Sequence, residues 1–151
     1  MKRLFLLLYF LPLYVAAAPA ERILDISEQI KQRIQQDRFQ SIDRLIQATI
    51  LVECGGNYLA VGRDNDLGPL QITPVRLRDY NRKTGKSYTH QDCFRIEISR
   101  EIFLFYAERI GTDESNWQQI ARRWNGGPAG HKIASTKSYW NKIQKQLNQI
   151  A

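Results

Sequence analysis

Glu53 is the residue whose type and position point most directly to chemistry. It follows the apolar run Ile50, Leu51 and Val52, and two glycines at residues 55–56 lie just beyond it. A carboxyl group at such a helix end is expected to be partly desolvated, which disfavours its charged form and raises its pKa towards the range of a general acid. A solvated helix end or a salt bridge to an arginine is the alternative. Position alone leaves both interpretations open.

Cys54 and Cys93 are the second group of interest, because they are the only two cysteines. An even number of cysteines in an exported chain favours a disulfide, and this pair is the candidate. His90 lies three residues before Cys93, so a zinc site completed by Cys54 and His131 is an alternative. Structural zinc sites usually combine two short-spaced pairs, and here there is one. We therefore expect no metal.

The elements that position these residues are predicted to be helices, because apolar residues recur at steps of three and four. Ser41 and Asp113 are the expected N-caps, and Thr73 is expected to cap a helix that begins with Pro74. The expected helices cover residues 21–37, 41–53, 74–82, 99–110, 113–124 and 136–150, with a short one near 91–95.

Residues 55–68 are rich in Gly, Asn and Asp and are predicted to form a loop with at most a minimal β-hairpin. No stretch alternates between apolar and polar residues over several positions, which argues against a β-sandwich or barrel. The predicted fold class is all-α. Residues 21–151 have the size of a single compact domain, and no repeat or linker divides them.

The first 20 residues resemble a secretory signal peptide. Lys2 and Arg3 precede an apolar run over residues 4–18, and the small residues of Ala18-Pro-Ala20 follow it. The run is shorter than the roughly 20 residues that a spanning helix needs, so we expect cleavage after Ala20 rather than an anchor. The predicted location is periplasmic or extracellular. The formal net charge of +7 favours acidic polymers as partners.

Two ordered blocks of sequence resemble the soluble lytic transglycosylase and goose-type lysozyme group of the lysozyme-like superfamily. The first block is ECGGNYLAVG at residues 53–62, followed by LGPLQITP at residues 67–74. The second is RWNGGP at residues 123–128, followed by the Thr and Tyr of residues 136–140. The resemblance implies a lysozyme-like fold and peptidoglycan glycan strands as the substrate, with no cofactor.

The resemblance also implies that Glu53 is the catalytic acid and base. The expected reaction is that of a lytic transglycosylase, which cleaves the bond between N-acetylmuramic acid and N-acetylglucosamine and leaves a 1,6-anhydro end. A lysozyme-type hydrolase would cleave the same bond with water. Most glycosidases that use water need a second carboxylate, for which Asp64 and Asp66 are the candidates, although clustered Asp residues are also common turn formers.

Five further residues are implied as substrate contacts in the cleft. Gln71 and Asn125 offer side-chain amides, and Tyr139 matches a tyrosine that lies near the catalytic Glu in this group. Trp124 replaces the usual tyrosine before the Asn, so it offers an indole N–H where the group has a hydroxyl. Tyr58 lies in the first block. The alternatives are a core role for Tyr139 and backbone contacts for Gln71.

A different class of function is a basic module that binds or inhibits without cleaving. Its working surface would be Arg122, Arg123, Lys132, Lys137, Lys142 and Lys145, although such charges commonly cover a solvated helix face. Nucleic acid is not expected as a partner, because no recognised binding motif accompanies the charge. Further expected partners are a secretion or wall-remodelling complex, or a protein inhibitor.

Overall fold

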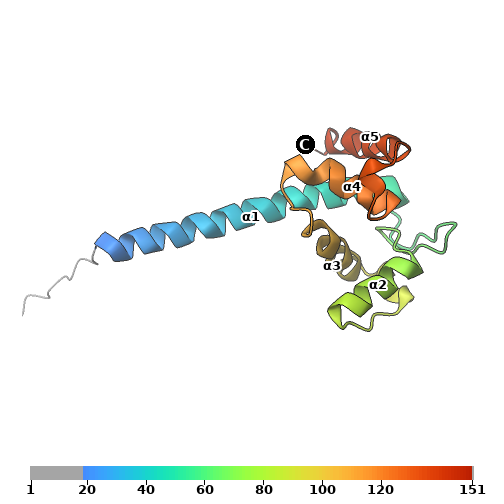
Figure 1. The fold of residues 1–151 in the computed structure, drawn as a ribbon, viewed down its shortest axis with the longest axis horizontal. Coiled ribbons are helices and arrows are strands. Elements are labelled where there is room, and N and C mark those ends of the chain that lie inside the picture. Colours follow the sequence, from blue (N-terminus) through green and yellow to red (C-terminus); the bar gives the residue numbers. More distant parts are fainter. Residues whose placement is uncertain (1–18, 151) are drawn as a thin grey trace, which may run out of the picture. The chain divides into compact units, whose positions relative to one another are not determined.

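The fold is described from a computed structural model that places residues 19–150 (Figure 1). Residues 1–18, which contain the apolar run of the predicted signal peptide, lie outside the described residues. The α-helices are α1 (Pro19–Cys54), α2 (Pro74–Thr84), α3 (Ile96–Ala107), α4 (Trp117–Gly126) and α5 (Thr136–Leu147). Three short 3₁₀-helices join them: η1 (His90–Phe94), η2 (Glu114–Asn116) and η3 (Gly130–Lys132). The all-α prediction is confirmed.

Helix α1 runs without a break through Ser41, so the prediction of two separate helices over residues 21–37 and 41–53 was wrong. The physical reason is that no glycine or proline lies between the two predicted stretches. Serine inside a helix costs only a few tenths of a kcal/mol relative to alanine, so a capping residue alone does not end a helix. The chain nevertheless divides into two compact units, with the boundary between Gln35 and Gln36 inside α1.

The first unit carries the isoleucines of the N-terminal part of α1. Ile23, Ile26, Ile30 and Ile34 follow one helical stripe as predicted, but each is exposed, by 49 to 66%. The periodic pattern therefore predicted the helix correctly, whereas the apolar stripe is not buried within the described residues.

The second unit contains the hydrophobic core. In Figure 1, α4 and α5 lie beside each other, and α4 is in direct contact with both α5 and η3. The largest fully buried apolar side chains come from α1, α2, α3, α5 and the loop before α2: Ile42, Leu45, Ile46, Ile50, Leu70, Ile72, Tyr80, Ile102, Phe103 and Ile143. Burying such side chains contributes about 1.5–3 kcal/mol each, which holds the C-terminal turn of α1 firmly in place.

The observed helix starts agree with the sequence to different degrees. Thr73 caps α2 as predicted, because its hydroxyl accepts a hydrogen bond from the backbone N–H of Arg76 at 3.2 Å. Helix α3 begins at Ile96, three residues before the predicted start at Ser99. Ser99 is buried and donates its hydroxyl to the carbonyl oxygen of Cys93 at 2.6 Å, so it ties α3 to η1 instead of capping α3.

The segment between α1 and α2 forms the minimal β-structure that the sequence allowed. Leu67 makes antiparallel bridges to both Val61 and Ile72. Gly68 has φ 80°, and a Cβ atom there would lie 2.0 Å from the carbonyl oxygen of Cys93, so only glycine fits. This packing fixes the loop against η1. Within residues 19–150, no helix is both long and apolar enough to cross a membrane.

Candidate active site

Glu53 lies in the last turn of α1 and is half-buried. Ile46 and Ile50, in the preceding turns, are buried and anchor this end of the helix in the core. Gly55 and Gly56 follow with φ 60° and 88°, a backbone conformation that ends the helix directly after Cys54. The negative end of the helix dipole also lies here, which disfavours a charged carboxylate.

Tyr139 of α5 is the side chain that contacts Glu53. Its hydroxyl donates a hydrogen bond to Oε1 of Glu53 at 2.6 Å, and the tyrosine itself is only 7% exposed. Burial is the main cause that raises the pKa of Glu53, and the hydrogen bond from Tyr139 opposes it. The pKa of Tyr139 lies well above its usual value, because burial and the neighbouring carboxylate disfavour the phenolate. Tyr139 is therefore a donor throughout the working pH range.

Arg76 of α2 supplies positive charge to this carboxyl group and lowers the pKa of Glu53. Its guanidinium lies 3.9 Å from the centre of the Trp124 ring, and Nη2 donates to the carbonyl oxygen of Trp124 at 2.5 Å. Both contacts restrict where the charge can lie. Trp124 therefore affects Glu53 indirectly, because it holds the Arg76 guanidinium in place.

Trp124, predicted to contact the substrate, is buried and makes its contacts within the protein, so its role as a substrate contact stays a prediction. It is 4% exposed, its indole N–H donates to the carbonyl oxygen of Leu70 at 3.2 Å, and its ring packs against Phe103. Through these contacts Trp124, which belongs to α4, holds the loop before α2 against that helix. The aromatic ring that matched the sequence motif packs in the core.

Asp66 is the second carboxylate that acts on Glu53. Its charge raises the pKa of Glu53. Asp66 is half-buried and its Oδ1 accepts a hydrogen bond from the backbone N–H of Asp64 at 3.1 Å. Asp64 is exposed. Of the two predicted candidates, the structure brings only Asp66 into electrostatic range of Glu53, and Asp66 also serves the turn.

Gln71 is buried and uses its amide to hold the loop together. Its Nε2 donates to the carbonyl oxygens of Gly68 at 2.9 Å and Ala60 at 3.2 Å. Gln71 also has φ 48°, which is uncommon for a residue other than glycine. An amide nitrogen has two N–H donors, and both are used here. Only the side-chain oxygen is left to meet a substrate.

Asn125 and Tyr58 are not brought into contact with Glu53. Asn125 lies in the last turn of α4 and is exposed, and Tyr58 lies on the loop after α1 and is 37% exposed. Neither side chain has a hydrogen bond to Glu53. As substrate contacts they stay predictions.

Cys54 and Cys93 are free thiols, so the disulfide that their even number suggested is not formed. Cys54 donates to the carbonyl oxygen of Ile50 at 3.3 Å, and burial raises the pKa of Cys93 to about 12. The two histidines of the zinc alternative are used elsewhere: His90 contacts the carbonyl oxygen of Ile72, and His131 contacts Arg123. Over the described residues, no group of three or more His, Cys, Asp or Glu side chains could hold a metal ion.

Arg76 and Lys142 are the site residues that the sequence motifs did not identify. Lys142 was assigned only to a basic surface, yet it follows Tyr139 by three positions on α5, and its charge lowers the pKa of Glu53. That spacing puts the two side chains on one helix face and is the signal that was available. Arg122 was assigned to the same surface but is only 9% exposed and bonds to Thr136, which corrects that assignment.

No protein-family model matches the chain, and a comparison with curated proteins finds no match either.

Proposed function

We propose that this protein cleaves the glycan strands of peptidoglycan as a lytic transglycosylase of the lysozyme-like superfamily, with Glu53 as acid and base. The observation that carries the proposal is the environment of Glu53: a half-buried carboxyl group with a raised pKa, held by a tyrosine at 2.6 Å. Tuning of this kind is characteristic of catalytic groups. The order of the two sequence blocks around Glu53 and Tyr139 supports the substrate.

In the proposed reaction, the protonated carboxyl group of Glu53 donates its proton to the glycosidic oxygen as the bond to the anomeric carbon breaks. The substrate N-acetyl group assists at that carbon. Glu53, now a carboxylate, removes the proton from the muramyl 6-hydroxyl, whose oxygen bonds to the anomeric carbon. One proton passes to the leaving sugar, one returns to Glu53, and no water is consumed. A single carboxyl group serves both steps.

The neighbours of Glu53 have separate tasks in this proposal. Tyr139 donates to Oε1 of Glu53, which leaves Oε2 to carry the transferred proton. Burial keeps the acid form populated, whereas Arg76 and Lys142 stabilise the carboxylate that exists between the two steps. These opposed effects hold the pKa of Glu53 between the high value that favours the acid form in the first step and the low value that favours the carboxylate in the second.

The alternative outcome is hydrolysis of the same bond, and Asp66 is the observation that favours it. Its charge acts on Glu53 from the adjacent loop, and a second carboxylate is what water-dependent glycosidases use. Under this alternative Asp66 assists the attack of water on the anomeric carbon, and the product has a reducing end.

Mass spectrometry of muropeptides released from purified peptidoglycan tests both outcomes. The lytic transglycosylase yields products that are lighter by one water than those of a hydrolase, and they disappear in Glu53→Gln. Glu108→Gln, which removes an exposed carboxylate at the end of α3, is the matched control and retains activity. Reducing products that depend on both Glu53 and Asp66 establish the hydrolase. If neither the unmodified protein nor Glu53→Gln releases muropeptides, the proposed enzyme is contradicted and the basic binding module is favoured.

A further inference from the structure

A cavity of about 460 Å³ lies between α2, α3 and α4, and Glu53 does not line it. This volume is within the range of about 300–1,000 Å³ that small-molecule sites occupy. Its walls include apolar side chains that belong to the core or pack against it: Phe103, Ala107, Ile110, Ile120 and Trp124. An apolar interior of this size favours the hydrophobic body of a ligand. The function proposed above does not use it.

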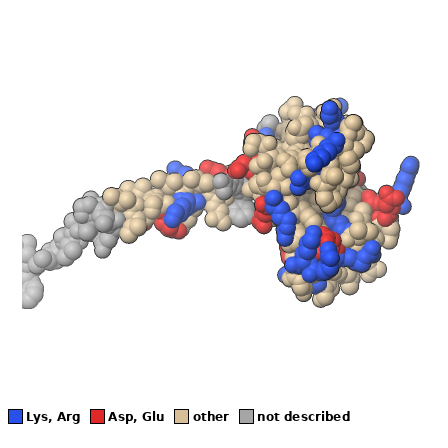
Figure 2. Space-filling model, viewed as in Figure 1, with Lys and Arg blue, Asp and Glu red and all other residues tan. Residues whose placement is uncertain are grey.

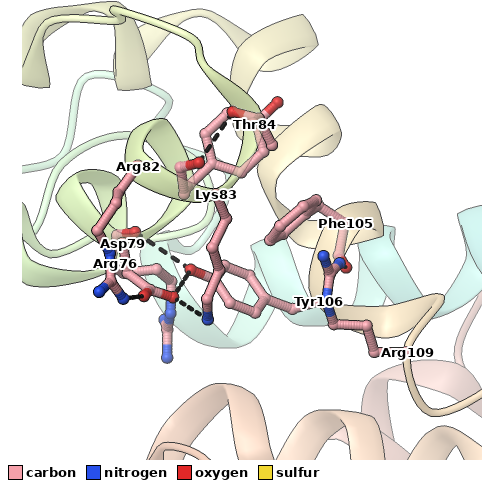
Figure 3. A network of polar contacts seen from close by, with 9 residues as sticks. Arg76, Asp79, Arg82, Lys83, Thr84, Phe105, Tyr106 and Arg109 are labelled. Atoms are coloured by element: carbon pink, nitrogen blue, oxygen red, sulfur yellow. Dashed lines mark hydrogen bonds and ion pairs between the residues drawn. The ribbon is translucent and has the colours of Figure 1, made fainter.

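The charged groups that line the cavity are mainly basic. Arg76 and Lys83 come from α2, Arg109 follows α3, and Arg123 comes from α4. Asp79 is the one acidic residue among the described lining residues, and it is already engaged with basic and tyrosyl groups (Figure 3). Lysine and arginine side chains also gather around α2 on the face seen in Figure 2. The positive charge favours an anionic ligand.

Hydrogen bonds and packing preorganise this wall of the cavity. Asp79 accepts from Lys83 at 2.6 Å and from the hydroxyl of Tyr106 at 2.8 Å. Figure 3 shows Arg109 lying along the ring of Phe105, and its guanidinium carbon is 3.4 Å from the ring centre. Side chains that are already held in place lose less entropy when a ligand binds.

We propose that this cavity is a second binding site, which takes a small anionic amphiphile: a molecule with an apolar body and one carboxylate, sulfonate or phosphate group. The apolar body occupies the space beside Phe103 and Ile120, and the acid group meets Arg109 and Arg123 at the rim. Because Arg76 lines the cavity and also acts on the carboxyl group of Glu53, a bound anion changes the electrostatic environment of Glu53.

Fluorescence titration with 8-anilinonaphthalene-1-sulfonate tests the site without any assay of activity. N-phenyl-1-naphthylamine, the same body without the sulfonate, is the matched probe. Arg109→Gln is expected to weaken the sulfonate about tenfold and to leave the neutral probe within twofold, since a charge-assisted contact is lost. Arg78→Gln removes an exposed arginine of α2 that does not line the cavity, and it leaves both probes unchanged. Equal affinity of the two probes in the unmodified protein overturns the proposal.

A cavity-filling variant locates the bound probe. Val75 lines the cavity but is 66% exposed, so Val75→Trp occupies the entrance without disturbing the core. We expect it to abolish binding of both probes while circular dichroism and the melting temperature stay the same. Unchanged binding in Val75→Trp places the probes elsewhere and overturns the proposal. Val75→Trp also tests anionic vesicles of phosphatidylglycerol: loss of vesicle binding assigns a lipid as the ligand, and unchanged vesicle binding with lost probe binding assigns a soluble anion.

The meaning of the link between the cavity and Glu53 rests on the proposed function. Its test needs only the affinity of the probe and no assay of activity. Tyr139 of α5 bonds to Glu53, and the charges that act on Glu53 are those of Lys142 of α5, Arg76 of α2 and Asp66 of the loop. An anion beside Arg76 offsets its charge, so by reciprocal linkage the sulfonate binds more tightly when Glu53 is protonated. Affinity is expected to rise severalfold as pH falls through the pKa of Glu53.

Glu53→Gln is the control for this link, because it retains every other titrating group. His131, which contacts Arg123 at the rim, is the main one near neutral pH. Glu53→Gln is expected to bind the sulfonate tightly at every pH. It keeps the pH dependence that comes from His131 and loses the part that comes from Glu53 in the unmodified protein. Identical pH profiles overturn the link through Arg76. If the protein is inactive on peptidoglycan but the two pH profiles differ, the proposed function is contradicted and the second binding site is not.

Discussion

Glu53 and Glu101 both accept a hydrogen bond from a tyrosine hydroxyl, yet the pKa of Glu53 is raised and that of Glu101 is lowered. Glu101, on α3, is bonded by Tyr80 and by Tyr88, the latter at 2.8 Å, and its side chain is 40% exposed. Hydrogen bonds to the charged form are the main cause at Glu101, whereas burial is the main cause at Glu53. The same pair of residue types therefore serves structure in one place and fits acid catalysis in the other.

Asp79 extends the comparison to a third carboxylate with a tyrosine partner. It accepts from Tyr106 at 2.8 Å, but Lys83 and Arg82 also contact it at 2.6 Å each. Hydrogen bonding from Lys83 is the main cause that holds the pKa of Asp79 far below its usual value. A carboxylate with two adjacent cations cannot act as an acid near neutral pH. What distinguishes Glu53 is desolvation without a direct ion pair.

The largest expected effect comes from removing the carboxyl group of Glu53. Glu53→Gln is expected to lower kcat on peptidoglycan by about 10²–10⁴-fold, the contribution that general acid–base catalysis makes. Glu101→Gln changes the other tyrosine-bonded carboxylate and is expected to leave kcat within twofold. Muropeptide release measured for both variants checks this. Comparable losses in the two would remove the distinction between the sites.

The second prediction concerns the hydroxyl of Tyr139. Tyr139→Phe removes the hydrogen bond to Glu53, and a bond to a charged group contributes about 1.5–3 kcal/mol. We expect kcat to fall by roughly tenfold, since 1.36 kcal/mol corresponds to that factor. The pKa of Glu53 rises further when the bond is lost, so the alkaline limb of the pH–rate profile moves to higher pH.

Tyr88→Phe is the matched control for Tyr139→Phe, because it removes one tyrosine hydroxyl from Glu101. It is expected to affect stability slightly and the pH–rate profile not at all. A lowered kcat in Tyr139→Phe with an unmoved alkaline limb would indicate that the tyrosine is structural.

The helical elements were predictable from the sequence because they depend on local signals. The step of three and four residues predicted α2, α4 and α5, and Thr73 with Pro74 predicted the start of α2. The break at Ser41 was wrong because a capping residue is also tolerated within a helix. The exposure of Ile23 to Ile34 was not predictable either, since a periodic stripe shows which face is apolar and not what covers it.

The candidate site was predictable only in part. The apolar helix end made Glu53 a candidate but left a solvated or salt-bridged role open, and the resemblance selected both Glu53 and Tyr139. Arg76 acts on the carboxyl group of Glu53 from α2, a different helix, and no local sequence signal reports such a placement. The burial of Trp124 was not predictable for the same reason, since a tryptophan matches a cleft pattern and a core pattern equally well.

The third prediction tests Asp79 as a structural carboxylate. Its pKa is lowered in the folded protein, so its stabilising effect is present above the usual pKa of about 4 and is lost as pH falls below it. Asp79→Asn is expected to lower the free energy of unfolding at pH 7 by roughly 1–2 kcal/mol, as partly exposed charged contacts do. Urea denaturation at pH 7 and at pH 2 checks this, and the difference between the two proteins is expected to shrink at pH 2.

The smallest expected effect has the opposite sign and concerns the stability of Glu53→Gln. The pKa of Glu53 is raised in the folded protein, so folding is favoured while the group is protonated, and this advantage is lost as pH rises through the raised pKa. Glutamine stays neutral and can still accept the hydrogen bond from Tyr139, so the variant avoids that loss. We expect its melting temperature to exceed that of the unmodified protein by roughly 3 °C at pH 8, with no difference at pH 4. Calorimetry at both pH values measures this, and a variant that is less stable at pH 8 would show that the carboxylate of Glu53 supports the fold, as Asp79 does.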